Sequence, residues 1–307
     1  MLSNLLWLLT FFSFLFSCDA PQAFKEDAPF SITIKEGYVF PYDFKNPDKS
    51  IDLENELLEI SGLSILNEET IAAIQDEDGV IFLLNKKGKI TRECDFHKKG
   101  DYEGVEVVGN MVYAVKSNGK VYVIENLGES NQELQIFETY LNKLANIEGL
   151  GYDKKNNRLL LAAKGKMAED PTFSRAVYGF DLNENKLAEK PLFTIDLEQV
   201  HDYLDSDEPV KHLEKISEKL DPAKGGFTFG TSGIAVHPIT GNYYLISSIG
   251  KMLMVVSPEG EIIHIEKFKK KIHPQPEGIC FESDGTMWIA NEGNKSKPSI
   301  LKFKYKK

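Results

Sequence analysis

The chain has 307 residues, a formal net charge of -11 at pH 7 and 42% hydrophobic residues. This acidic balance argues against a nucleic-acid-binding protein and against a basic face that binds membranes. Beyond the first 20 residues the only cysteines are Cys94 and Cys280, so disulfide bonds are not expected to be the basis of the fold.

The N-terminal segment carries an export signal. Met1 to Ser17 is apolar and uncharged, and a run this short is typical of a secretory signal rather than a membrane-spanning helix. Its ending, Leu15-Phe16-Ser17-Cys18, resembles a bacterial lipobox, which would make Cys18 the palmitate-bearing first residue of an exported, membrane-anchored envelope lipoprotein. No Lys or Arg precedes the apolar run, so a simple signal peptide or an N-terminal anchor remains the alternative. We expect a signal peptide over 1–17, a tether over 18–30 and one domain over 31–307.

A short motif ending in Gly and an aliphatic residue recurs along the chain. The five copies are Ile60-Ser61-Gly62-Leu63, Tyr102-Glu103-Gly104-Val105, Ile147-Glu148-Gly149-Leu150, Thr231-Ser232-Gly233-Ile234 and Pro276-Glu277-Gly278-Ile279. Their glycines are 42, 45, 84 and 45 residues apart. A period in this range is typical of propellers and solenoids.

Each repeat reads as several short strands joined by polar turns. In the first repeat the strand candidates are 60–66, 70–74, 80–85 and 89–94, with glycine in the turns between them. Segments this short do not fit a helical period. The sequence therefore predicts an all-β, five-bladed β-propeller, with six blades as the alternative.

The interval of double length contains a different pattern. Segments 158–163, 176–181 and 192–197 would complete the third blade. Residues 199–220 then place Leu213, Ile216 and Leu220 at helical spacing, which favours a helical insertion over a sixth blade. Because the last repeat is short, we expect residues 31–44 to supply its missing outer strand and so close the ring.

In a propeller, the starts of first strands and the ends of second strands meet at one mouth of the central channel. This topology would bring together Glu103, Glu148 and Glu277, whose carboxylates would repel one another unless something positive lies between them. Calcium takes such oxygen ligands, whereas no His or Cys recurs there to favour zinc or copper. The same mouth would receive further candidate ligand-binding residues: Asp76, Glu77, Lys116, Lys164, Ser232 and Glu292.

Two alternatives to a metal site remain open. Lys116 and Lys164 are other possible counter-charges, and they are also candidates for binding an anionic ligand. Each glutamate before a glycine would alternatively serve only to cap backbone N–H groups where blades meet.

The order of the motifs also resembles a known family. The segments EISGLSIL, DYEGVEVVGNMVYAV, NIEGLGYDKKNNRLLLAAK and PQPEGICFESDGTMWIANEG resemble the SdiA-regulated domain family of bacterial envelope proteins, from about Leu57 onward. The resemblance implies a five-bladed propeller with a bound calcium ion and no established catalytic activity. By position, Glu103, Glu148 and Glu277 are the residues that would bind the ion, while Ser61 and Ser232 replace glutamate in the other two copies.

Three functions compete at this point. The first is a non-enzymatic, calcium-binding, lipid-anchored monomer that binds an unidentified ligand or envelope protein. The second is a metal-dependent hydrolase, lactonase-like or phytase-like, in which a metal at the mouth polarises the substrate. No nucleophile motif supports it, and we name no catalytic residue. The third is a structural ring whose glutamates serve only the packing of blades.

Overall fold

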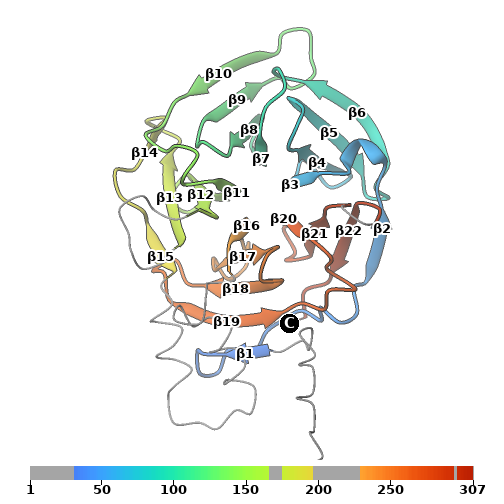
Figure 1. Cartoon of the computed structure of the whole chain (residues 1–307), viewed down its shortest axis with the longest axis vertical. Helices are drawn as coiled ribbons and strands as arrows, with labels where there is room; N and C mark the ends of the chain where they lie inside the picture. The colour runs from blue at the N-terminus through green and yellow to red at the C-terminus, as the bar shows by residue number, and fades with distance from the viewer. Residues whose placement is uncertain (1–30, 166–174, 196–228, 294–295, 307) are drawn as a thin grey trace, which may run out of the picture.

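The structure, a computed structural model, describes residues 31–165, 175–195, 229–293 and 296–306. Five small antiparallel sheets stand around a central axis like the blades of a propeller (Figure 1). The helical content of the described residues is one 3-10 turn, η1 (Asn55–Leu57), and none of their helices is long and apolar enough to cross a membrane.

The blades follow one another in sequence. Blade 1 contains β3 (Ile60–Ile65), β4 (Thr70–Gln75), β5 (Val80–Asn85) and β6 (Ile90–Asp95). Blade 2 contains β7 (Tyr102–Val108), β8 (Met111–Lys116), β9 (Val121–Glu125) and β10 (Glu133–Phe137). Blade 3 contains β11 (Ile147–Asp153), β12 (Arg158–Ala163), β13 (Arg175–Asp181), β14 (Lys186–Leu187) and β15 (Phe193–Ile195). Blade 4 contains β16 (Thr231–Val236), β17 (Tyr243–Ser247), β18 (Met252–Val256), β19 (Ile262–Lys267) and β1 (Ser31–Thr33). Blade 5 contains β20 (Pro276–Phe281), β21 (Met287–Asn291), β22 (Ser299–Phe303) and β2 (Lys49–Asp52).

The prediction of a five-bladed, all-β propeller is confirmed. Each sequence motif begins the innermost strand of one blade, as the repeat predicts. In blade 3 the outermost strand is split, because β14 and β15 both pair with β13. The predicted helical insertion over 199–220 lies outside the described residues.

The N-terminal segment closes the ring, but not with the predicted residues. The outer strand of blade 5 is β2, which pairs with β22 over Lys49–Asp52, so the expectation that 31–44 would form it was wrong. Residues 31–33 instead extend blade 4 as β1, beside β19. Residues 38–44 do not form a strand, and their aromatic side chains pack on blades 4 and 5, with Tyr42 and Phe44 buried there.

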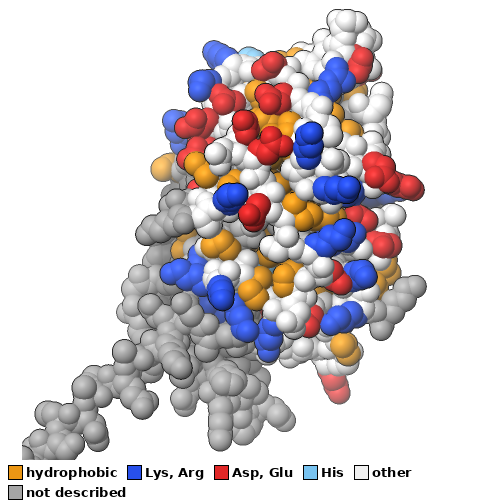
Figure 2. All heavy atoms as spheres, turned by 90° about the vertical axis from the view of Figure 1, so that its right-hand side faces the viewer, with side chains coloured by type: hydrophobic (Ala, Val, Ile, Leu, Met, Phe, Trp, Pro, Cys, Tyr) orange, Lys and Arg blue, Asp and Glu red, His pale blue; other side chains and the backbone are white. Residues whose placement is uncertain are grey.

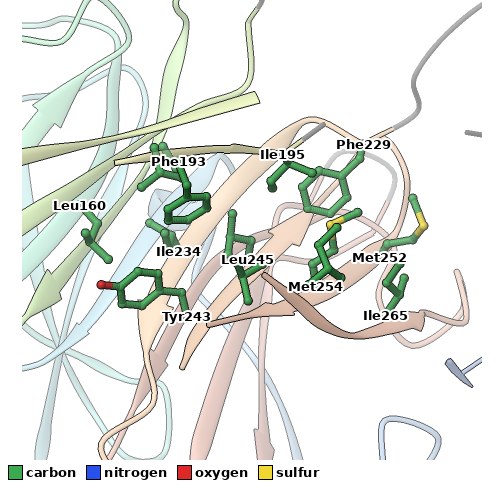
Figure 3. Packing of buried hydrophobic residues seen from close by; sticks show 14 residues of the cluster. Leu160, Phe193, Ile195, Phe229, Ile234, Tyr243, Leu245, Met252, Met254 and Ile265 are labelled. Carbon is green, nitrogen blue, oxygen red and sulfur yellow. The ribbon is translucent and has the colours of Figure 1, made fainter. Parts of the chain in front are cut away.

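The core lies between neighbouring blades. Successive side chains of a strand point to opposite faces of its sheet, and each face meets another blade. In β12, Leu159 and Leu161 therefore pack toward blade 2, while Leu160 packs toward blade 4. Figure 3 shows this second interface, where Phe193 and Ile234 fill the space between blades 3 and 4. Burial on both faces explains why second strands such as β12 are nearly continuous apolar runs.

The outer surface carries charges of both signs. On the side of the ring that holds β2, lysine and arginine side chains are interspersed with acidic ones and with small apolar patches (Figure 2). This side of the ring is therefore neither purely basic nor purely acidic.

Candidate functional site

The motif residue before each glycine lies in a β-bulge. The register between first and second strands shifts at Ile60/Gly62, Tyr102/Gly104, Ile147/Gly149, Thr231/Gly233 and Pro276/Ile279. A bulge bends its strand and re-aims the side chain of the extra residue. Five equivalent bulges therefore turn Ser61, Glu103, Glu148, Ser232 and Glu277 toward one end of the channel.

The motif glycines permit neighbouring blades to approach closely at the axis. A Cβ atom on Gly104 would lie 2.6 Å from Cβ of Leu150 in the next blade. One on Gly233 would lie 2.5 Å from the carbonyl oxygen of Glu277. Any other residue at these positions would push the blades apart and widen the ring, so the glycines keep the glutamates of neighbouring blades close together.

The two serines of the motif bond to the following blade. Ser61 donates a hydrogen bond to the carbonyl of Tyr102 (2.9 Å), and Ser232 donates one to the carbonyl of Pro276 (2.7 Å). Tyr102 and Pro276 immediately precede Glu103 and Glu277 in the chain. The serines therefore hold the backbone that presents these two glutamates. Whether Ser232 also contacts a ligand stays a prediction.

Glu148 is held by two neighbours. Its carboxylate accepts a hydrogen bond from Nδ2 of Asn146 (2.7 Å) and forms an ion pair with Nζ of Lys164 (2.6 Å). Burial raises the pKa of Glu148, although Lys164 and Asn146 oppose that rise. Burial lowers the pKa of Lys164, but attraction to Glu148, Glu277 and Glu103 outweighs it and raises the pKa overall.

Glu103 and Glu277 lack a direct cationic partner among the described residues. Burial, reinforced by repulsion from Glu148, raises the pKa of Glu103 to about 9. Burial also raises the pKa of Glu277 to about 8, against the attraction of Lys164. The inner mouth thus holds three carboxyl groups and one ammonium group, and the raised pKa values leave Glu103 and Glu277 largely protonated at pH 7.

Further acidic side chains lie beyond this inner group, on blades 5, 1 and 2. Burial and the charges of Glu59, Glu292, Glu77 and Asp101 raise the pKa of Asp76 to about 6. Oδ1 of Asp76 is buried without a hydrogen-bond partner, whereas Glu77 is exposed and Glu292 accepts a hydrogen bond from Gln275. These acids extend the negative field of the mouth toward its rim.

Lys116 lies apart from the three motif glutamates. Its Nζ atom sits over the ring of Tyr102, 4.9 Å from the centroid. Burial lowers the pKa of Lys116, and the nearest acidic influence on it is Asp101. Of the two lysines predicted at the mouth, Lys164 is therefore the one that pairs with a motif glutamate.

An aliphatic ring closes the channel beneath the carboxylates. It consists of the residues that follow the motif glycines, all of them at most 5% exposed: Leu63, Val105, Leu150, Ile234 and Ile279. The cavity between this ring and the glutamates has a volume of about 10 Å³. That space is close to what a single water molecule needs, so it suits one small ion rather than an organic molecule.

The carboxyl groups at the mouth are suitable ligands for a hard cation, but in this structure they lie too far apart to enclose one. Carboxyl oxygens from three blades, once they have lost their protons, are the kind of ligands that calcium takes. Among the residues that the structure describes, no group of three or more His, Cys, Asp or Glu side chains is close enough to hold a metal. One of the three, Glu148, is drawn to Lys164 instead.

Several of these residues are recognisable only in the structure. Asn146 precedes its motif by one residue and has no counterpart in the other copies, so the repeat gives no reason to single it out. The linking role of Ser61 and the sealing role of Leu63 depend on the neighbouring blade, which a single repeat does not reveal.

Comparison with known proteins supports the fold and the family. A glutaminyl cyclase from Myxococcus xanthus has 11% identity and a TM-score of 0.55, over 85% of this chain and 96% of the cyclase. A PQQ-bound aldose sugar dehydrogenase from Streptomyces coelicolor has 11% identity and a TM-score of 0.49, over 84% and 97% of the two chains. At such identities the likeness to the cyclase shows the fold alone.

The family model described as SdiA-regulated matches residues 42–295, a span that contains all five motifs and the whole channel mouth. The chain belongs to the SdiA-regulated family.

Proposed function

We propose that this protein is a lipid-anchored module of the bacterial envelope that binds a calcium ion at the channel mouth and has no catalytic role of its own. The observation that carries this proposal is the inner mouth itself. Carboxyl groups from three blades, buried in Glu148 and Glu277 and half-buried in Glu103, share the mouth with one ammonium group above a space for one small ion. Buried charges are favourable only when they are paired, so a cation between these groups would stabilise them.

Calcium would be held by Glu103, Glu148 and Glu277, with water completing its ligands. Glutamate side chains have several rotatable bonds and can converge on an ion without movement of the blades. A bound ion would replace the protons of Glu103 and Glu277 and cross-link blades 2, 3 and 5. The ligand or envelope protein that binds the loaded mouth remains to be identified, and the outer acids Asp76, Glu77 and Glu292 are our candidates for contacting it.

The alternative, a metal-dependent hydrolase, finds less support. The space above the aliphatic ring suits an ion and not an organic substrate. Of the two lysines that could stabilise a developing anion in that mechanism, Lys116 lies over Tyr102 and Lys164 pairs with Glu148. Hydrolysis of lactones or phosphoesters by the calcium-loaded chain would support the metal-dependent hydrolase instead.

Calcium titration tests the proposal. We expect the chelator-treated full chain in detergent to bind about one Ca²⁺ in a calorimetric titration. Glu103→Gln and Glu277→Gln should each weaken binding at least about tenfold, because each removes one charged ligand. Both variants should still fold, since burial already favours the neutral form of these carboxyl groups.

Glu77→Gln serves as the control, because Glu77 is an exposed acid on the same side of the ring. It should bind calcium like the wild type. No heat from the wild-type chain, or equal losses in all three variants, would refute a calcium site at the motif glutamates.

Lipid anchoring gives a second expected result. Metabolic labelling with palmitate should mark the wild-type chain, which should sediment with membranes. Cys18→Ala should abolish both the label and the sedimentation, whereas Cys94→Ala should change neither, because Cys94 is buried in the propeller. A label that persists in Cys18→Ala would show that another residue carries the lipid, whereas sedimentation without a label would show that the anchor is not a lipid.

A further inference from the structure

The neighbours of Lys164 fix where its side chain can lie. Lys164 directly follows β12, and its backbone N–H donates to the carbonyl of Asn146 (2.9 Å). The side chain of Asn146 in turn donates to Glu148. A Cβ on Gly230, at the start of blade 4, would lie 2.9 Å from Cγ of Lys164. Because residue 230 is a glycine, there is room beside it for the aliphatic part of the Lys164 side chain. The ammonium group of Lys164 therefore reaches the mouth.

This ammonium group is the one cation inside the ring of motif glutamates that the structure describes. It lies 2.6 Å from Glu148 and is also attracted by Glu277 and Glu103. A calcium ion bound by the same three carboxylates would need the same central place. Two cations in contact with one set of ligands repel each other strongly in a partly buried site. The lysine and the ion therefore exclude each other.

We propose that Lys164 sets the cation affinity of the mouth, because its ammonium group holds the place that an inorganic cation must take. This inference rests on the proposed calcium site and adds an exchange: the ion enters as the ammonium leaves Glu148. The lysine compensates the charge of Glu148 when calcium is scarce, and the affinity for calcium is therefore lower than three carboxylates alone would give.

The structure shows why the ammonium group is able to leave. Among the described residues its one direct polar contact is Glu148, and its side chain remains 22% exposed. Lysine has a flexible four-carbon stem, so the ammonium group can swing to solvent while the stem stays beside Gly230. A bidentate arginine would be harder to displace.

Calcium calorimetry on Lys164 variants of the full chain in detergent tests the exchange. Lys164→Met keeps the stem and removes the charge, so it should bind Ca²⁺ roughly tenfold more tightly than the wild type or better. Lys164→Arg keeps the charge and should bind no more tightly than the wild type. Lys116→Met is the matched control, since Lys116 lies over Tyr102, and its affinity should be unchanged.

A second readout follows the lysine itself. Reductive ¹³C-methylation gives each lysine amine an NMR signal. The signal that is present in the wild type and absent from Lys164→Met belongs to Lys164. It should shift when calcium is added to the methylated wild type, because the amine exchanges Glu148 for water. This measurement, together with Lys164→Arg, decides the question even if Lys164→Met fails to fold.

The outcomes separate the two proposals. If the wild type binds calcium but Lys164→Met binds equally or more weakly and the methylated signal does not move, the exchange is refuted while the calcium site stands. If only Lys164→Met binds calcium, the proposed calcium function of the natural protein fails and no exchange occurs there, because the lysine keeps the ion out. If neither chain binds calcium, both proposals fail.

Discussion

Replacing Phe44 by alanine should lower the free energy of unfolding by about 3–5 kcal/mol. Phe44 is 3% exposed and lies with its ring centroid 4.9 Å from those of Phe268 and Phe303. Phe268 directly follows β19 of blade 4, and Phe303 is the last residue of β22 in blade 5. The side chain of Phe44 therefore joins the two blades. Removing the Phe44 side chain leaves a cavity where the N-terminal segment packs between blades 4 and 5.

Urea denaturation of the full chain measures this effect. Val39→Ala is the control from the same segment, because Val39 is 83% exposed and its truncation should cost less than about 0.5 kcal/mol. Equal stabilities of the two variants would mean that the segment lies on the ring without holding it closed.

Lowering the pH should destabilise the same junction, where the N-terminal segment packs on blades 4 and 5. His237 is buried, and its Nδ1 atom accepts hydrogen bonds from the backbone N–H groups of Ile239 and Thr240. Nε2 therefore carries the proton and donates to the hydroxyl of Tyr42, which donates to the carbonyl of Gly285. This chain of bonds needs a neutral imidazole, because a proton on Nδ1 would face two other donors.

Burial lowers the pKa of His237 to about 4, whereas the unfolded chain has an ordinary histidine pKa near 6.5. A group whose pKa is lower in the folded state stabilises the fold above the unfolded pKa and loses that contribution as pH falls. The wild type should therefore lose up to about 3 kcal/mol of stability between pH 6.5 and pH 4 from this residue.

Thermal unfolding at several pH values checks this expectation. His237→Gln should be less stable than the wild type at pH 7, and its stability should fall less between pH 6.5 and pH 4. Parallel pH curves for the two proteins would show that His237 is not the group that titrates.

The fold was predictable because a propeller repeats its local chemistry. Each blade needs a glycine where it meets its neighbour at the axis and small polar turns between its strands, and these leave a visible period in the sequence. The ring closure was not predictable in detail. β2 (Lys49–Asp52) is short, polar at three of its four positions and paired with the far end of the chain, so its pattern resembles that of a loop.

The candidate site was predictable to the level of which residues share the mouth. The position before each glycine followed from the repeat, and the bulges place Glu103, Glu148 and Glu277 as it implies. What the sequence left open was how their charge is balanced. Lys116 and Lys164 occupy similar positions after second strands, and only the packing around Tyr102 and Gly230 separates their roles.

Anomalous diffraction tests most directly whether a calcium ion binds among the motif glutamates. Crystals of the protein grown with calcium, and with strontium as a stronger anomalous scatterer, should show one peak at the mouth between Glu103, Glu148 and Glu277. The ammonium group of Lys164 should then have left Glu148. A mouth without an anomalous peak at saturating calcium, with Lys164 still paired to Glu148, would contradict the account.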